Sequence, residues 1–416
     1  MEMHIRNYLR FVLSVFVAAG HVSLYPQPSL IHLSIGSDLT KGKSAPITVT
    51  WSSENITGMQ NVVFGQKPHP SKSVKARETG YSGGAVYSAE LNGLRRGRTY
   101  FYKCGSDAAG WSRIYSFSTE PLKGSFTVAV IGDTQDNTNN ENFVKSAGVL
   151  SAVRQHKPDL TLHMGDIVND GSMTSSWENY LKMSQDINAE SPLMPVLGNH
   201  DVNNVKGDNF QMPFDDFHDL FNLPGDEVNY SFTYGKVRFI GIFSGYAQAA
   251  EPLGEVKFKP GSPEYAWLDT ELTRAENDRG IDWIIVWMHY PVNSFGWSNV
   301  KGWGDNILPL LNNHSVDLCL AGHRHVYERH LQVKNGKVAE KDTTKSLSAS
   351  EGTLFITNGT AGGNPTNPGG KEISTVAYTP DRIMYSYAIM VIDRGSIAFK
   401  VFDEDNNTID HFVLTK

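Results

Sequence analysis

The chain has 416 residues, which is long for one small domain and suggests two domains or three. Its hydrophobic content of 40% and charged content of 19% are typical of a globular protein and exclude a disordered one. A net charge of −7 excludes a general nucleic-acid binder, because no excess of lysine and arginine is present to neutralise phosphates.

Residues 1–20 have the composition of a secretory signal. Arg6 and Arg10 precede the apolar run FVLSVFVAAG, which ends in small residues suited to cleavage near Gly20. The alternative is a membrane anchor, but a bilayer requires about 20 apolar residues, and this run has roughly half as many. We therefore expect a cleaved signal peptide, no transmembrane segment, and a protein that is secreted or delivered to a lysosome or vacuole.

Export also bears on the cysteines and on glycosylation. Cys104 and Cys319 lie in apolar runs of different predicted domains, so two separate buried thiols are expected rather than a disulfide. In an exported protein, Asn-X-Ser/Thr sequences are acceptors for N-linked glycans. The candidate glycosylation sites are Asn55, Asn229, Asn313 and Asn406.

Residues 26–120 contain a succession of short strand patterns. Segments such as ITVTWSS, AVYSAEL and RTYFYKCG alternate apolar and polar residues and are separated by Gly, Pro, Asn and Ser. Several short strands at this spacing predict an all-β sandwich domain of the immunoglobulin or fibronectin type III kind. The segment TEPLKG, from Thr119 to Gly124, is the predicted linker after this domain.

The pattern changes at Phe126, and we predict a second domain over residues 125–416. Near-continuous apolar runs such as FTVAVIGD, WIIVWMHYP and VDLCLAGHRH are typical of strands covered on both faces. Helical patterns lie between them, at about residues 140–156 and from Pro263 to Asp278. The sequence therefore predicts an α/β layered domain, a β-sandwich flanked by helices, with antiparallel strands near its C-terminus.

Polar residues of metal-binding type follow five of the predicted buried strands. They are Asp133, Asp166, Asn199 with His200, His289, and His323 with His325. Strand ends on one edge of a layered α/β sheet converge in space, and carboxylate, amide oxygen and imidazole together bind divalent or trivalent metals. One metal rarely needs so many protein ligands, so we expect two metals that share a carboxylate. His323 and His325 project to the same side of an extended segment, so each can reach one of the two metals.

The ordered set GD, GD, GNHD, H and GHRH resembles the signature of the calcineurin-like metallophosphoesterases. The ending GHRHVYER and the N-terminal sandwich resemble the purple acid phosphatases in particular. The resemblance covers the chain from about Gln27 to the C-terminus, and its motifs are highly specific for the superfamily. It implies a metal-dependent phosphoric ester hydrolase that uses two metal ions, with Fe, Zn, Mn and Mg all left open.

The resemblance also implies a role for each matching residue. The implied metal ligands are Asp133, Asp166 and His325 for the first metal, and Asp166, Asn199, His289 and His323 for the second. Asp166 would therefore bridge the two metals. His200 would contact the substrate phosphate and protonate the leaving group.

Two positions depart from the purple acid phosphatase pattern. Asn169 stands where that family has the tyrosine whose phenolate binds Fe(III) and gives the colour, so we expect no purple band. Gln135 stands where other metallophosphoesterases carry a ligand histidine. Either amide could supply an oxygen to the first metal, or water could do so, and Asn169 could instead orient His200.

The predicted activity is hydrolysis of a small-molecule phosphate monoester by attack of metal-bound hydroxide. A phosphodiesterase or nucleotide pyrophosphatase on the same centre is the alternative, which the altered first metal site favours slightly. A non-catalytic binding module is a second alternative, because structural metal sites also preserve their ligands. His200 speaks against the binding module, since the family does not use this histidine as a metal ligand. The sequence leaves the natural substrate and the oligomeric state open.

Overall fold

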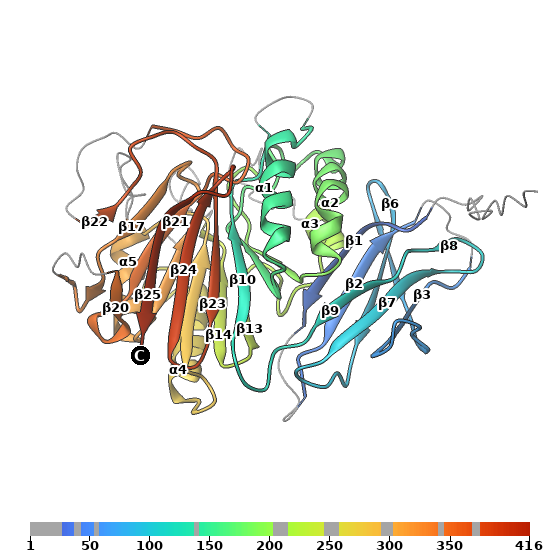
Figure 1. Ribbon diagram of the computed structural model, residues 1–416, viewed down its shortest axis with the longest axis horizontal. Coiled ribbons are helices and arrows are strands. Elements are labelled where there is room, and N and C mark those ends of the chain that lie inside the picture. Colours follow the sequence, from blue (N-terminus) through green and yellow to red (C-terminus); the bar gives the residue numbers. More distant parts are fainter. Residues whose placement is uncertain are drawn as a thin grey trace, which may run out of the picture.

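The computed structural model shows a smaller all-β domain beside a larger layered domain (Figure 1). It describes residues 27–36, 43–53, 58–136, 141–202, 215–244, 258–292, 303–339, 345–367 and 375–416. The predicted signal peptide, residues 1–20, and the candidate glycosylation site Asn55 lie outside the described residues.

The N-terminal domain is built from two antiparallel sheets. One sheet has the order β1 (Ser29–Ile35), β2 (Ile47–Ser52), β6 (Gly84–Leu91), β5 (Arg77–Tyr81). The other contains β4 (Lys72–Lys75), β3 (Asn61–Gly65), β7 (Thr99–Ser106) and β8 (Gly110–Trp111), with β9 (Tyr115–Ser118) paired to β7. Trp51 of the first sheet and Tyr102 of the second are both fully buried and belong to one hydrophobic core. The predicted all-β class is confirmed, while the boundaries 26–120 and 125–416 stay predictions.

The second domain contains two mixed sheets of seven strands each. The first has the order β12 (Leu193–Pro195), β11 (Leu160–His163), β10 (Phe126–Ile131), β23 (Ser386–Ile392), β24 (Ser396–Asp403), β25 (Thr408–Thr415), β20 (Ser346–Ser348). The second has the order β13 (Tyr230–Tyr234), β14 (Val237–Ile242), β15 (Trp283–Met288), β16 (Leu318–Ala321), β21 (Leu354–Asn358), β17 (Tyr327–His330), β22 (Val376–Tyr378). Strands β18 (Val333–Lys334) and β19 (Lys337–Val338) form a separate hairpin.

Helices lie on the outer faces of these sheets, as predicted (Figure 1). They are α1 (Val144–Gln155), α2 (Thr174–Asn188), α3 (Asp215–Leu220), α4 (Pro263–Asn277) and α5 (Trp303–Asn313). Helix α4 begins where its sequence predicts, because the Ser262 side chain accepts a hydrogen bond from the Tyr265 amide at 3.2 Å and Pro263 occupies the first helical turn. Strand β15 is buried along its whole length, which explains its unbroken apolar sequence.

The two domains are joined by polar contacts as well as by packing. His32 of β1 places Nε2 3.0 Å from the carbonyl oxygen of Leu220, at the end of α3. The Tyr102 hydroxyl donates to the carbonyl of Ala189, just after α2, at 2.8 Å. The N-terminal domain is thereby held against α2 and α3.

The cysteine prediction is confirmed, because Cys104 and Cys319 are both buried and free. Burial raises the pKa of the Cys104 thiol to about 12 and raises that of Cys319 as well, so neither is a reactive thiolate. Among the described residues, no helix has the length and apolarity needed to cross a bilayer.

The candidate glycosylation sites differ in exposure. Asn229 is only 9% exposed, and its Oδ1 accepts a hydrogen bond from the Phe243 amide at 2.9 Å. An N-linked glycan is attached to Nδ2 rather than to this oxygen, so the contact does not decide the question and glycosylation at Asn229 stays a prediction. Asn313 and Asn406 are exposed, and glycosylation there stays a prediction.

Candidate metal centre

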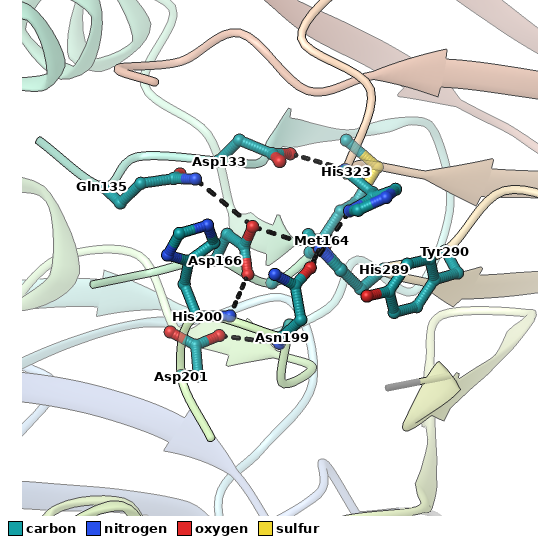
Figure 2. Close-up of polar contacts among 12 residues, drawn as sticks. Asp133, Gln135, Met164, Asp166, Asn199, His200, Asp201, His289, Tyr290 and His323 are labelled. Carbon is teal, nitrogen blue, oxygen red and sulfur yellow. Dashed lines mark hydrogen bonds and ion pairs between the residues drawn. The ribbon is translucent and has the colours of Figure 1, made fainter. Parts of the chain in front are cut away.

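Each candidate ligand follows the carboxyl end of a strand. Asp133 follows β10, Asp166 follows β11, Asn199 follows β12, His289 follows β15, and His323 follows β16. Strands β10, β11 and β12 are parallel neighbours, and so are β15 and β16, so their carboxyl ends share an edge. Figure 2 shows the side chains from both sheets turned toward a common point.

The convergence produces two overlapping groups of metal-binding atoms. One group is Asp166, His289 and His323, and the other is Asp133, Asp166 and His325. Within each group, the nitrogen and carboxylate oxygen atoms all lie within 4.8 Å of one another. Asp166 belongs to both groups, which is the arrangement expected of a carboxylate shared by two cations.

Asn199 adds an amide oxygen to the group formed by Asp166, His289 and His323. Its Oδ1 lies 3.0 Å from His289 Nε2 and 3.0 Å from His323 Nδ1 (Figure 2). The sequence-predicted ligands Asp133, Asp166, Asn199, His289, His323 and His325 are therefore all brought together.

Hydrogen bonds on the outer side of two imidazoles fix which nitrogen faces the centre. His289 Nδ1 lies 2.8 Å from the carbonyl of Met164, and His325 Nδ1 lies 2.8 Å from the carbonyl of Asn364. A carbonyl only accepts, so each Nδ1 carries the proton, and in the neutral ring Nε2 has a lone pair. His289 Nε2 lies 3.2 Å from Asp166 Oδ2, and His325 Nε2 lies 3.4 Å from Asp133 Oδ1. Two such acceptors face each other stably only with a proton or a cation between them.

The titration of these groups follows from that geometry. Burial lowers the pKa of His289, but the charge of Asp166 and its hydrogen bond outweigh burial and raise the pKa to about 9. Burial favours protonated Asp166, yet the charge of His289 keeps the pKa of this carboxyl below its usual range. Without a metal, the pair holds a proton at neutral pH, and a cation can take that place.

Two buried oxygens at the site also favour a cation. Among the described residues, Asp133 Oδ1 and Gln135 Oε1 are buried and accept no hydrogen bond. The amide nitrogen of Gln135 lies 3.2 Å from Asp166 Oδ2 (Figure 2). The same nitrogen lies 3.4 Å from His325 Nε2. Because the two ends of a glutamine amide are interchangeable by a flip, either can face the centre. The donor set thus fits two metal ions.

Backbone strain is concentrated at the same positions. Asp133, Asp166 and His323 have φ angles of 56°, 51° and 65°, in the left-handed region that residues with a Cβ rarely adopt. Each such residue costs on the order of 1–3 kcal/mol and persists only where surrounding contacts enforce it. Three strained ligands on three loops indicate a geometry kept for function.

Close packing of glycines keeps those loops in place, and Gly198 provides a test. A Cβ on Gly198 would lie 2.3 Å from the backbone nitrogen of Asp166, which cannot move without displacing the shared carboxylate. We expect Gly198→Ala to lower the free energy of unfolding by about 1–3 kcal/mol and to reduce bound metal, as measured by urea denaturation and elemental analysis.

The matched control for Gly198→Ala is Gly148→Ala. Gly148 lies in α1, where a Cβ would meet nothing within 4 Å. Alanine is the better helix former, so this change should raise stability by about 0.5–1 kcal/mol and leave activity unchanged. Equal effects of the two substitutions would contradict the close-packing argument.

His200 lies beside the shared carboxylate with its ring held from one side. Its backbone amide donates to Asp166 Oδ1 at 2.8 Å, and its Nδ1 donates to the carbonyl of Asn169 at 2.9 Å. The ring is half-buried, and Nε2 is the nitrogen left to exchange a proton. The sequence suggested that the Asn169 side chain could orient His200, whereas the observed contact comes from its backbone carbonyl.

Asp201 anchors this part of the site. The sequence leaves open whether a carboxylate after His200 orients the loop or is simply solvated, and Asp201 is only 2% exposed. Its Oδ1 accepts from the amides of Ile167 and Val168 at 2.8 and 3.1 Å, and its Oδ2 accepts from Gly198 at 2.7 Å. It therefore ties the loop after β11 to the loop after β12.

Glu141 and Tyr290 are two neighbours of the site that sequence analysis missed. Glu141 accepts a hydrogen bond from the amide of Asn169, and the Tyr290 ring lies 4.1 Å from the ring of His323, centroid to centroid. Glu141 has no motif around it. Tyr290 directly follows a candidate ligand, and that adjacency is the only signal that could have identified it.

Comparison with known proteins agrees with this arrangement. Residues 126–327 match the family model of the calcineurin-like phosphoesterases, and residues 28–119 match that of the purple acid phosphatase N-terminal domain. Purple acid phosphatase 21 of Arabidopsis thaliana is 23% identical over 331 residues, which cover 77% of this chain and 70% of the relative. Acid phosphatase type 7 of Danio rerio is 26% identical over 375 residues, covering 82% of this chain and 80% of the relative.

A solved structure supports the fold of the whole described chain. The purple acid phosphatase PPD1 from yellow lupin seeds superimposes with a TM-score of 0.78 at 19% sequence identity, covering 94% of this chain and 74% of the lupin chain. The chain is a purple acid phosphatase-like member of the calcineurin-like metallophosphoesterase superfamily. It is a metal-dependent phosphoric ester hydrolase, as the sequence predicts, and its family implies a dinuclear metal centre.

Proposed function

We propose that this protein hydrolyses small-molecule phosphate monoesters outside the cytosol, using two metal ions. The observation that supports the proposal most strongly is the pair of ligand groups that share Asp166, with His200 hydrogen-bonded beside them. A binding module that keeps metal only for stability has no need of a half-buried imidazole in this position.

We propose ligands for both ions from the donor atoms that converge. Asp133, Asp166 and His325 would hold the first ion, and Asp166, Asn199, His289 and His323 the second. Gln135 would complete the first ion with its amide oxygen after a flip, which also gives its buried Oε1 a partner. The carboxylate and imidazole donors suit iron, zinc and manganese, and the carboxylate and amide oxygens suit magnesium.

The residues divide the chemistry between them. Two bound metal ions would supply a nucleophile near neutral pH by lowering the pKa of water, and would offset charge on the phosphoryl oxygens. Asp166 fixes the spacing of the two halves of the site because it belongs to both. His200, held through Nδ1 by the Asn169 carbonyl, offers Nε2 to deliver a proton to the departing alcohol oxygen.

A substitution at His200 tests the proposed activity. We expect His200→Ala to lower kcat for an alkyl phosphate by about 100-fold or more, because the alkoxide leaves poorly without a proton. The loss should be smaller for 4-nitrophenyl phosphate, whose leaving group needs less protonation. Wild-type rates on both substrates, with metal content unchanged, would show that His200 does not serve this reaction.

The same assay separates the monoesterase from the diesterase alternative. Two substitutions in the first metal site favour the diesterase alternative: Asn169 stands in place of the family tyrosine, and Gln135 stands in place of the ligand histidine. A higher kcat/KM on bis(4-nitrophenyl) phosphate than on 4-nitrophenyl phosphate would replace the monoesterase proposal with that alternative.

The colour of the purified protein provides another prediction. We expect no purple absorption band even when iron is bound, because Asn169 cannot supply a phenolate. A visible spectrum recorded with elemental analysis tests this, and a purple band in iron-loaded protein would contradict it.

The proposed location outside the cytosol rests on residues 1–20 and on the exposed sequons at Asn313 and Asn406. Secretion and delivery to a lysosome or vacuole are both consistent with these features. Treatment of the protein from its native source with an N-glycosidase, followed by N-terminal sequencing, distinguishes an exported from a cytosolic chain.

A further inference from the structure

A buried carboxyl group outside the ligand set contacts Asn169, the residue whose carbonyl oxygen holds His200. Glu141 lies between β10 and α1, is 5% exposed, and has a φ angle of 33° that a residue with a Cβ rarely adopts. Burying a carboxyl group is costly unless its contacts compensate. A buried, strained glutamate therefore calls for a function in the folded protein.

The contact that Glu141 makes is with the loop that carries the shared ligand. Its Oε1 accepts a hydrogen bond from the backbone amide of Asn169. The preceding two amides, those of Ile167 and Val168, donate to Asp201. Three consecutive backbone N–H groups after Asp166 are thus held by two buried carboxyl groups on two other loops.

Capping of α1 does not explain Glu141. The amides of Asn142 and Phe143, which precede the helix, donate to Asp136 Oδ2 at 3.1 and 3.2 Å. Asp136 therefore anchors the start of α1, and the Glu141 side chain turns instead toward the loop after β11.

The position of Asn169 matters because its carbonyl oxygen holds His200 Nδ1 at 2.9 Å. Asp201 holds the two residues before Asn169. The hydrogen bond from the Asn169 amide to Glu141 is therefore the next constraint along the loop. We propose that Glu141 is a positioning residue that acts through Asn169 to aim the His200 imidazole at the leaving group. The proposal rests on the proposed function, since it assumes that His200 delivers that proton.

The test compares three substitutions at Glu141 on two substrates. Glu141→Met has nearly the same size but no oxygen acceptor, and Glu141→Gln keeps an acceptor. We expect Glu141→Met to lower kcat for an alkyl phosphate by about 10-fold or more with KM nearly unchanged, and to affect 4-nitrophenyl phosphate much less. Glu141→Gln should restore most of the rate. If Glu141→Met does not fold, Glu141→Asp carries the same test, because the shorter side chain withdraws the acceptor and keeps the charge.

A double-substitution cycle distinguishes positioning from a structural role. In a His200→Ala background, Glu141→Met should cause no further loss on the alkyl phosphate, because the residue acts only through His200. Additive losses, equal losses on both substrates, or loss of bound metal would overturn the proposal. An unchanged alkyl phosphate rate in His200→Ala alone would instead refute the role of His200, which is a separate failure.

Discussion

We expect Asp166→Asn to abolish measurable phosphatase activity. The substitution keeps the shape of the side chain but removes the charge that both ligand groups share, and Asp166 is only 2% exposed, so no solvent can replace it. A rate loss of roughly 1,000-fold or more is expected, comparable with the loss of a principal electrostatic stabiliser of a transition state. Steady-state kinetics on 4-nitrophenyl phosphate measures the loss of rate, and elemental analysis of the same sample measures the loss of bound metal.

The matched control for Asp166→Asn is Asp405→Asn, which removes an exposed carboxylate far along the chain. It should leave activity and metal content unchanged. The bridging role would be wrong if Asp166→Asn retained two metal ions per chain and near-normal kcat. Loss of one ion with retained activity would show that a single ion is sufficient.

The position of the site was predictable because strand burial and strand ends are encoded locally. Runs such as those of β10 and β15 are apolar throughout since both faces of each strand are covered. Parallel neighbours bring their carboxyl ends to one edge, so the polar residue that ends each apolar run identifies that edge. His323 and His325 fall in different ligand groups, but the segment is not extended as predicted, because the chain bends over residues 323–326 and His323 has a φ angle of 65°.

Contacts made by backbone atoms were not predictable. The sequence directed attention to the side chain of Asn169, yet its amide and carbonyl make the contacts to Glu141 and His200. Every residue has an amide and a carbonyl, so no residue type marks such a role. The role of Glu141 depends in turn on where that amide lies, and it has no sequence signal either.

Local patterns also failed where distant segments decide the outcome. A three-residue glycosylation sequence at Asn229 gives no sign that the side chain is buried and accepts a hydrogen bond from the distant Phe243 amide. The helix predicted from residue 140 begins at Val144, because Glu141 and Phe143 have positive φ angles that a helix cannot continue. Burial at Asn229 and the backbone conformation at Glu141 and Phe143 are properties of the folded chain that these local patterns do not encode.

Removal of the metal ions should destabilise the protein as well as inactivate it. Asp133 and Asp166 are buried carboxyl groups, and among the described residues their ion-pair partners in the absence of cations are the imidazoles of His325 and His289. A ligand present at about 1,000 times its dissociation constant stabilises the folded state by about 4 kcal/mol. For a domain of this size we therefore expect chelation to lower Tm by roughly 10 °C.

The size of that destabilisation should depend on pH in a defined direction. In the metal-free fold, the pKa of His289 is raised from 6.5 to about 9, so the protonated ring stabilises the fold fully below pH 6.5 and ceases to do so as pH rises through 9. This contribution is about 3 kcal/mol for a fully buried group. A cation competes with that proton, so the difference in Tm between metal-loaded and metal-free protein should widen from pH 6.5 to pH 9.

Differential scanning calorimetry of loaded and chelator-treated protein at several pH values measures this widening. Asp166→Asn is the control, because a variant that binds little metal and has lost the charge that raises the pKa of His289 should respond weakly to both chelator and pH. A chelated protein shown by elemental analysis to be metal-free, yet with an unchanged Tm at every pH, would contradict the idea that cations compensate these carboxylates. A difference that narrowed toward pH 9 would instead show that no proton on His289 substitutes for the metal.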